Sequence, residues 1–314
     1  MRQRWLLNIA LLGAVLILGT LVYTLEQKEP AELPKLTTLE ADKVQNIRIE
    51  RADAEPISLL KDNLGLWQVT APFKLPANSF RVERLLKILA ERNYQKLEAD
   101  NLNLAEFKLE PPLASIKFDQ LTVAYGDNSP MNDGKRYLLV NQNVYLVTDT
   151  VYHSIIDDAL VFANLSPLGN NSKITELKMP DYHLVLKEGQ WMLLSSTFST
   201  EEIDTSKDKL NALIENWQNA SAYKVQRYDA KEAAIGKIEI TLLGKEQPRH
   251  LTIVTKSPNL VLAWPAKGVQ YQFTANQVNK LLHLPTKNKP ADPTDITAPP
   301  PPVPAELQPS AGSS

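Results

Sequence analysis

Residues 64–89 read LGLWQVTAPFKLPANSFRVERLLKIL and contain a predicted strand, a loop and a helix in close succession. The strand carries Trp67, and two prolines follow it; proline cannot donate to a strand ladder, so these prolines end the strand. Asn78 or Ser79 is suited to cap a helix. The apolar residues that recur at helical spacing are Val82, Leu85, Leu86 and Leu89.

A second stretch, residues 188–217, repeats this order as EGQWMLLSSTFSTEEIDTSKDKLNALIENW, with Trp191 in the place of Trp67. Around each copy the pattern predicts a three-stranded beginning, the helix, an antiparallel meander and a closing helix. The first closing helix is predicted over residues 151–162. Repetition of one element order favours an internal duplication. We therefore predict an α+β fold with two tandem copies of a β-rich module, forming either one pseudo-symmetric body or two lobes.

The N-terminus predicts a membrane anchor. Residues 5–25 are almost entirely apolar, and about 20 such residues cross a bilayer as a helix. Arg2 and Arg4 precede this segment and Glu26 follows it, which places the N-terminus in the cytoplasm. We expect a single-pass signal anchor in the inner membrane, with the body in the periplasm. The alternative is a cleaved signal peptide, but no A-x-A site follows.

The predicted divisions follow the changes in composition. They are an anchor at 1–26, a linker at 27–40, modules at 41–165 and 170–284, and a Pro-rich tail at 285–314. The tail has no aromatic residue and cannot bury enough surface to fold, so it is predicted to be disordered. It is either a spacer or a peptide that docks in an aromatic groove.

Composition excludes several classes of function. The formal net charge of -2 offers no basic surface for a nucleic acid. The chain has no cysteine, which excludes disulfides, thiolate metal sites and a cysteine nucleophile.

Sequence motifs for catalysis or metal binding are weak. Four histidines lack metal-ligand spacing: His153, His183, His250 and His283. Residues 206–209 match S-x-x-K without the partner motifs of that class, and Ser206 is suited to start a helix. The acidic runs at 157–158 and 201–204 lack a calcium-loop pattern. We predict no catalytic residue, no metal ligand and no cofactor.

Five residues are candidates for an interaction site. Trp67, Trp191 and Trp264 are either core anchors or platforms on which sugar rings stack. Asp127 and Asn128 lie in a predicted polar loop, residues 126–134, and loops carry function more often than core positions do.

The string G-x-W-x-[VI]-x-x-P with its capped helix resembles a bacterial domain of unknown function, family number 4340. Residues 107–112 are similar to the family's F-G-L-x-x-P, with Lys108 in place of the glycine. Residues 121–126, Tyr137 and residues 144–147 are similar to its strand motifs.

The resemblance covers roughly residues 41–282. Family members look like single-pass, membrane-anchored proteins, and some occur beside auxiliary components of ABC-type transporters linked to gliding motility. The resemblance implies an envelope or transport-accessory role without an assigned activity. Our leading hypothesis is a non-catalytic accessory or scaffold protein with a membrane-protein partner. The alternatives are a module that binds a glycan or lipid-linked ligand between the repeats and, least favoured, a hydrolase.

Overall fold

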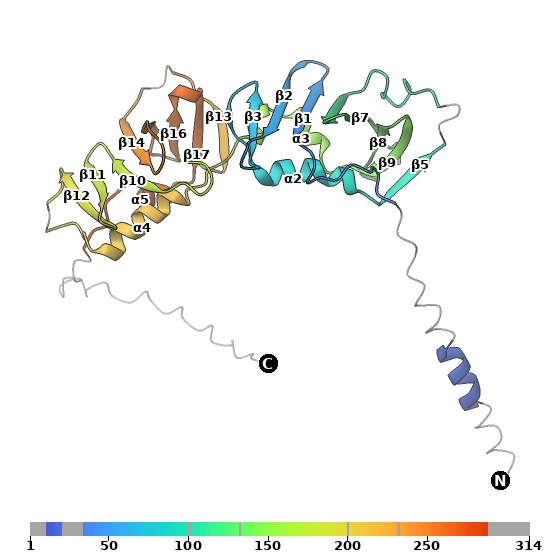
Figure 1. Cartoon of the computed structure of the whole chain (residues 1–314), viewed down its shortest axis with the longest axis horizontal. Coiled ribbons are helices and arrows are strands. Elements are labelled where there is room, and N and C mark those ends of the chain that lie inside the picture. Colours follow the sequence, from blue (N-terminus) through green and yellow to red (C-terminus); the bar gives the residue numbers. More distant parts are fainter. Residues whose placement is uncertain are drawn as a thin grey trace, which may run out of the picture.

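The computed structural model describes residues 11–20, 34–98, 102–131, 133–199, 201–230 and 233–287. Within these residues the chain is a mixed α+β protein with two antiparallel sheets, of nine and eight strands, and few helices (Figure 1). This confirms the predicted fold class and the antiparallel strands.

The first sheet has the spatial order β4-β3-β2-β1-β6-β7-β8-β9-β5. Its strands are β1 (Asn46–Arg51), β2 (Ala54–Lys61), β3 (Trp67–Ala71), β4 (Leu75–Pro76), β5 (Tyr94–Leu97), β6 (Ala114–Phe118), β7 (Leu121–Asn128), β8 (Lys135–Val140) and β9 (Asn143–Thr148). The predicted three-stranded beginning and the meander are one sheet, because β1 pairs with β6. Pairing of β5 with β9 then completes it.

The second sheet has the order β12-β11-β10-β14-β15-β16-β17-β13. Its strands are β10 (Ile174–Lys178), β11 (Tyr182–Lys187), β12 (Gln190–Ser196), β13 (Lys224–Arg227), β14 (Gly236–Leu242), β15 (Arg249–Thr255), β16 (Leu260–Trp264) and β17 (Val269–Phe273). Each has a counterpart at the same place in the first sheet, so that β12 corresponds to β3 and β13 to β5. Only β4 has no counterpart among the described strands.

Helices lie against one face of each sheet (Figure 1). They are α2 (Ser79–Lys87), η1 (Ile88–Ala90), α3 (Tyr152–Ile156), η2 (Ala159–Phe162), α4 (Lys207–Gln218) and α5 (Gln277–Leu282). A further short helix, η3 (Pro265–Lys267), lies in the turn between β16 and β17 and buries none of its residues. The side chain of Asn78 accepts a hydrogen bond from the Arg81 amide and so begins α2 as predicted. The apolar face of α2 buries Val82, Leu85 and Leu86 in the core of the first sheet.

The prediction of a single helix over residues 151–162 is wrong, because the structure has two short helices, α3 and η2, in this range. Asp157 is extended, with ψ of 177°, between α3 and η2. The carboxylate of Asp158 then accepts a hydrogen bond of 2.8 Å from the Leu160 amide and caps η2. Capping by this side chain favours a new start over continuation of the first helix.

A short backbone bridge closes the first lobe, which we define as residues 34–164. Ala77 pairs with Ala163, the Asn78 amide donates to the Phe162 carbonyl at 2.7 Å, and the Asn164 amide donates to the Pro76 carbonyl at 2.8 Å. The second lobe, residues 165–287, has an equivalent closing bridge. Its members are Ile203 with Thr286, Asp204 with Pro285 and Lys287 with Glu202.

The two lobes are joined through their apolar core, directly beside the connection between them. The Ala222 amide, just before β13, donates to the Leu165 carbonyl at 2.9 Å and so holds the start of the second lobe beside β13. Leu75, Leu160 and Ala163 of the first lobe belong to the hydrophobic cluster of the second. The lobes therefore share apolar contacts across their joint.

The predicted anchor is described only in part. Residues 11–20 are helical, with exposed leucine, isoleucine and valine side chains. Among the described residues, no helix combines the length and the apolar character that crossing a membrane requires. The remainder of the 5–25 segment, and the tail beyond residue 287, lie outside the described residues.

Candidate functional site

The structure places the three candidate tryptophans on separate strands. Trp67 opens β3, and Trp191 lies at the corresponding place in β12. Both are partly buried against the core of their own lobe. Trp264 ends β16, and four strands lie between β16 and β12 in the second sheet. The three rings therefore do not form one aromatic surface.

Cations lie over two of these rings. The Arg249 guanidinium is 4.2 Å and the Lys267 ammonium 5.7 Å from the Trp264 ring centroid. The Lys61 ammonium is 5.2 Å from the Trp67 centroid. Such contacts stabilise a partly exposed ring and occupy faces on which a sugar would have to stack.

Asp127 and Asn128 belong to a strand, because β7 continues to Asn128 beyond the predicted start of the loop. A carboxylate oxygen of Asp127 lies 2.8 Å from the Lys108 ammonium. The hydrogen bond from Lys108, followed by one from the Asn128 amide, holds the pKa of Asp127 below its ordinary value. The Asp127 amide in turn donates to the Phe107 carbonyl at 2.8 Å.

This contact explains two positions at which glycine is favoured. A Cβ on Gly126 would lie 2.3 Å from the Phe107 carbonyl oxygen, so that the close approach of the two chains requires glycine. Lys108 has φ of +52°, a left-handed conformation that glycine adopts at lower cost. The ion pair with Asp127 is the contact that the lysine side chain makes there.

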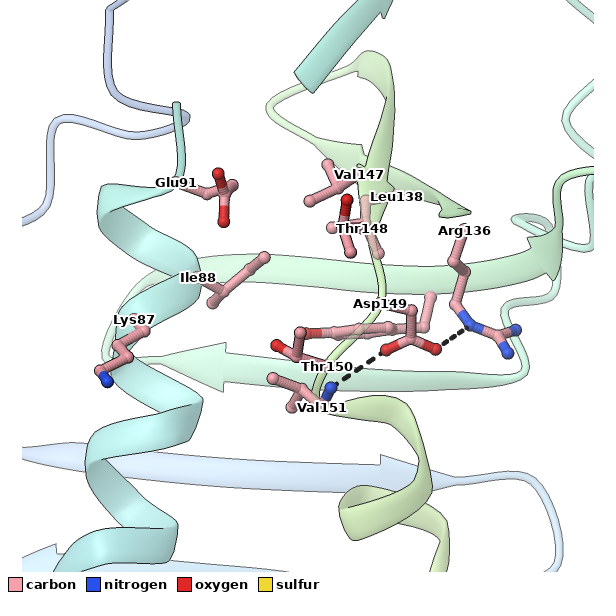
Figure 2. Close-up of a pocket in the computed structure, with 11 residues that line it drawn as sticks. Lys87, Ile88, Glu91, Arg136, Leu138, Val147, Thr148, Asp149, Thr150 and Val151 are labelled. Atoms are coloured by element: carbon pink, nitrogen blue, oxygen red, sulfur yellow. Dashed lines mark hydrogen bonds and ion pairs between the residues drawn. The ribbon is translucent and has the colours of Figure 1, made fainter. Parts of the chain in front are cut away.

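A small cavity lies between α2, η1 and the strands β7 to β9 (Figure 2). Beside it, Arg136 is buried, with 5% of the residue exposed. Its Nε lies 2.8 Å from an Asp149 carboxylate oxygen, and its Nη1 donates to the Gly126 carbonyl at 2.6 Å. The guanidinium also lies 3.6 Å from the centroid of the Tyr152 ring. All of these contacts are internal to the first lobe.

Asp149 has a second structural role. Its other carboxylate oxygen accepts hydrogen bonds from the amides of Val151 and Tyr152, at 3.1 and 2.9 Å. The same carboxylate therefore neutralises Arg136 and begins α3 (Figure 2). The charged groups of Arg136 and Asp149 are therefore both used in contacts that stabilise the fold.

Tyr125 is the polar group beside the cavity that lacks a hydrogen bond to any described residue. Its hydroxyl is buried, and burial raises the pKa of Tyr125 well above its ordinary value. The cavity volume is about 30 Å³, which suffices for one or two water molecules and for no organic ligand. We therefore interpret this cavity as part of the hydrophobic core and not as a ligand site.

A larger groove lies where the lobes meet, with a volume of about 430 Å³. That volume is in the range of small-ligand sites. Its charged and aromatic lining consists of Arg81, Asp157, Asp158, Tyr223, Lys224 and Arg227. One wall is η2 and the other is β13, an edge strand of the second sheet. The position agrees with the groove that we hypothesised between the repeats, but none of the candidate tryptophans lines it.

The lining residues differ in how they are held. The Arg81 Nη1 donates to the Ser154 hydroxyl at 3.3 Å, and Asp158 caps η2. Tyr223 is 52% exposed, with its hydroxyl held 3.2 Å from the Gln272 side chain. These side chains can offer hydrogen bonds, a ring face and positive charge. They do not provide a nucleophile paired with a base.

The histidines and the S-x-x-K segment stay apart from this groove. His183 Nε2 lies 2.7 Å from a Glu176 carboxylate oxygen on the second sheet. Ser206 precedes α4, and its amide donates to Asp204 at 2.9 Å. Hydrogen bonds from Ser206 hold the pKa of Asp204 below its ordinary value. No group of three or more histidine, aspartate or glutamate side chains in the described part of the chain could hold a metal ion.

Comparison with known proteins gives one match. A family model described as a domain of unknown function (DUF4340) matches residues 67–237, more than half of the chain. The match runs from β3 to the beginning of β14 and so crosses the joint between the lobes. No curated protein and no solved structure matches the chain.

Proposed function

Because the chain belongs to the family described as a domain of unknown function (DUF4340), we propose that it is a non-catalytic accessory or scaffold protein of a bacterial envelope complex. In this proposal residues 5–25 anchor it in the inner membrane, and two tandem copies of one module form its periplasmic body. The family resemblance favours an ABC-type transport system as the complex.

The joint between the lobes is the observation that carries this proposal. The apolar cluster that the two lobes share packs two similar sheets against each other, with the interlobe groove between them. A fixed body of this kind presents a constant surface, and a preformed surface lowers the entropic cost of association. This favours a binding role over a catalytic one.

Recovery of a partner from membranes tests the scaffold proposal. Tagged full-length chain, cross-linked in the membrane and then solubilised, should recover a specific membrane protein. Lys224→Glu with Arg227→Glu should reduce that recovery at least about tenfold, because reversed charges oppose a complementary partner surface. Lys187→Glu with Lys245→Glu reverses two exposed charges outside the groove and should leave recovery unchanged. Recovery of the protein alone would contradict the scaffold role.

A second candidate is a binding module for a glycan or a lipid-linked ligand in the groove. The exposed Tyr223 ring beside Lys224 and Arg227 favours it. Neither cation has an ion-pair partner within the described residues. An aromatic face with adjacent positive charge fits a sugar that carries phosphate.

Retention of lipid-linked sugar tests this second candidate. Full-length protein extracted from its own membranes should retain such a ligand in native mass spectrometry. Tyr223→Ala should reduce retention about tenfold, a loss of about 1.4 kcal/mol. Trp67→Ala serves as the control, since Trp67 lies outside the groove. If Trp67→Ala lowers retention and Tyr223→Ala does not, the groove is the wrong site.

A further inference from the structure

Within the part of the chain that the structure describes, no strand covers the outer edge of β12. β12 is an edge strand of the second sheet, and no described residue pairs with its free side. Its sequence, QWMLLSS, contains neither charge nor proline, the residues that usually protect such edges from pairing. Met192 and Leu194 are 48% and 49% exposed. Figure 1 shows this strand at the end of the body away from the first lobe.

The counterpart strand in the first lobe is covered. β4 pairs with β3, with Leu75 opposite Val69 and Pro76 opposite Gln68. The Ala77 amide then donates to the Trp67 carbonyl at 2.9 Å. The covering segment is thus Leu-Pro-Ala in an extended conformation.

Burial differs accordingly between the two strands. Val69 is 1% exposed, whereas Leu193, at the corresponding place in β12, stays partly exposed. Both strands carry an irregularity just after this position. Since the irregularity in β3 does not prevent β4 from pairing, β12 offers an edge of the same form.

The chain takes a different path after β12 than after β3. Residues 202–204 pair with residues 285–287 in the closing bridge, and the Lys287 amide donates to the Glu202 carbonyl at 3.0 Å. No described part of this segment returns to β12. Lys287, the last described residue, is therefore held beside Glu202, which follows the end of β12 by six residues.

We propose that residues 303–305 of the tail add to the free edge of β12, as residues 75–77 add to β3. These tail residues lie outside the described part of the chain, and their sequence is Val-Pro-Ala. In the register of the first lobe, Val303 covers Leu193 and Pro304 lies opposite Met192. Proline is tolerated at a sheet edge, where its missing N–H faces solvent.

Tail length and tethering permit this contact. The residues between Lys287 and Val303 can span about 50 Å when extended, and a strand of seven residues is about 23 Å long. A short flexible tether supplies an effective concentration on the order of millimolar. A three-residue contact too weak to hold a separate peptide is therefore populated within one chain.

Cross-linking tests the proposal directly, because the chain has no cysteine of its own. Met192→Cys with Pro304→Cys places two thiols opposite each other on the outer face, at a separation of about 5 Å between Cβ atoms. Under mild oxidation the full-length variant should form an intramolecular disulfide at least about tenfold faster than Met192→Cys with Ser310→Cys. Adding Val303→Asp to the first pair should remove the advantage.

Hydrogen exchange gives an independent measurement on the cysteine-free chain. Val303→Asp should make amides in β12 exchange at least about tenfold faster, while Ala298→Asp, elsewhere in the tail, should not. Equal disulfide rates in the two cysteine pairs, or equal exchange in the two aspartate variants, would overturn the proposal. Disulfide-linked dimers would assign the edge to a second copy instead, and capture of another protein would assign it to a partner.

Discussion

Replacing Arg136 with methionine should lower the free energy of unfolding by about 3–5 kcal/mol. Methionine fills much of the same space, but it leaves the Asp149 carboxylate, 12% exposed, without its cation. It also removes the donor to the Gly126 carbonyl and the cation above the Tyr152 ring. An uncompensated charge in a nearly dry site costs more than any of these contacts alone.

The free-energy cost of the unpaired Asp149 charge can be measured separately from the cost of lost packing. Chemical denaturation gives the free energy of unfolding of three full-length proteins: the unmodified chain, Arg136→Met, and Arg136→Met with Asp149→Asn. Comparison of the three isolates this cost. The added substitution removes the stranded charge and keeps an oxygen to accept from Val151 and Tyr152, so that part of the stability should return. Lys178→Met breaks an exposed pair with Glu239 and should cost less than about 1 kcal/mol. A similar small loss for Arg136→Met would contradict a structural role for the pair.

Local patterns predicted the elements of this fold well. The pattern in residues 64–89 predicted a strand that carries Trp67 and a capped helix after it, and the structure has β3 and α2 there, because apolar residues recur with the period of each element. Pairings between distant strands were not predictable in this way. Nothing in the sequence of β1 indicates that β6 will be its neighbour, since periodicity defines a strand without naming its partner.

The sequence predicted where the candidate site lies, between the repeats, but not which residues line it. Duplication pointed to a groove between the repeats, and the structure has one. Trp67 and Trp191 were candidates for the interaction site because they recur at the same place in both repeats. Recurrence in a repeat, however, is also expected of residues that pack within each copy. Tyr223, Lys224 and Arg227 line the groove because β13 is an edge strand beside η2. That neighbourhood is a long-range contact, so only the mixed basic and aromatic composition of residues 223–228 could have suggested it.

Replacing Trp217 with alanine should lower the free energy of unfolding of the second lobe by about 3–5 kcal/mol. The side chain is 0% exposed and lies in α4, where it joins the core of the second sheet. Its Nε1 donates to the Leu281 carbonyl in α5 at 2.7 Å. One residue thus fixes both helices to each other.

Trp217→Phe separates the two contributions. The ring still fills most of the space, but the buried Leu281 carbonyl loses its donor, which should cost about 1–3 kcal/mol. Trp191→Ala is the matched control, because Trp191 lies on an edge strand of the same lobe and is only partly buried. Denaturation followed by hydrogen exchange should show the loss from Trp217→Ala concentrated in α4 and α5. If Trp191→Ala costs as much, the helices are held through the strand tryptophan and Trp217 only fills space between them.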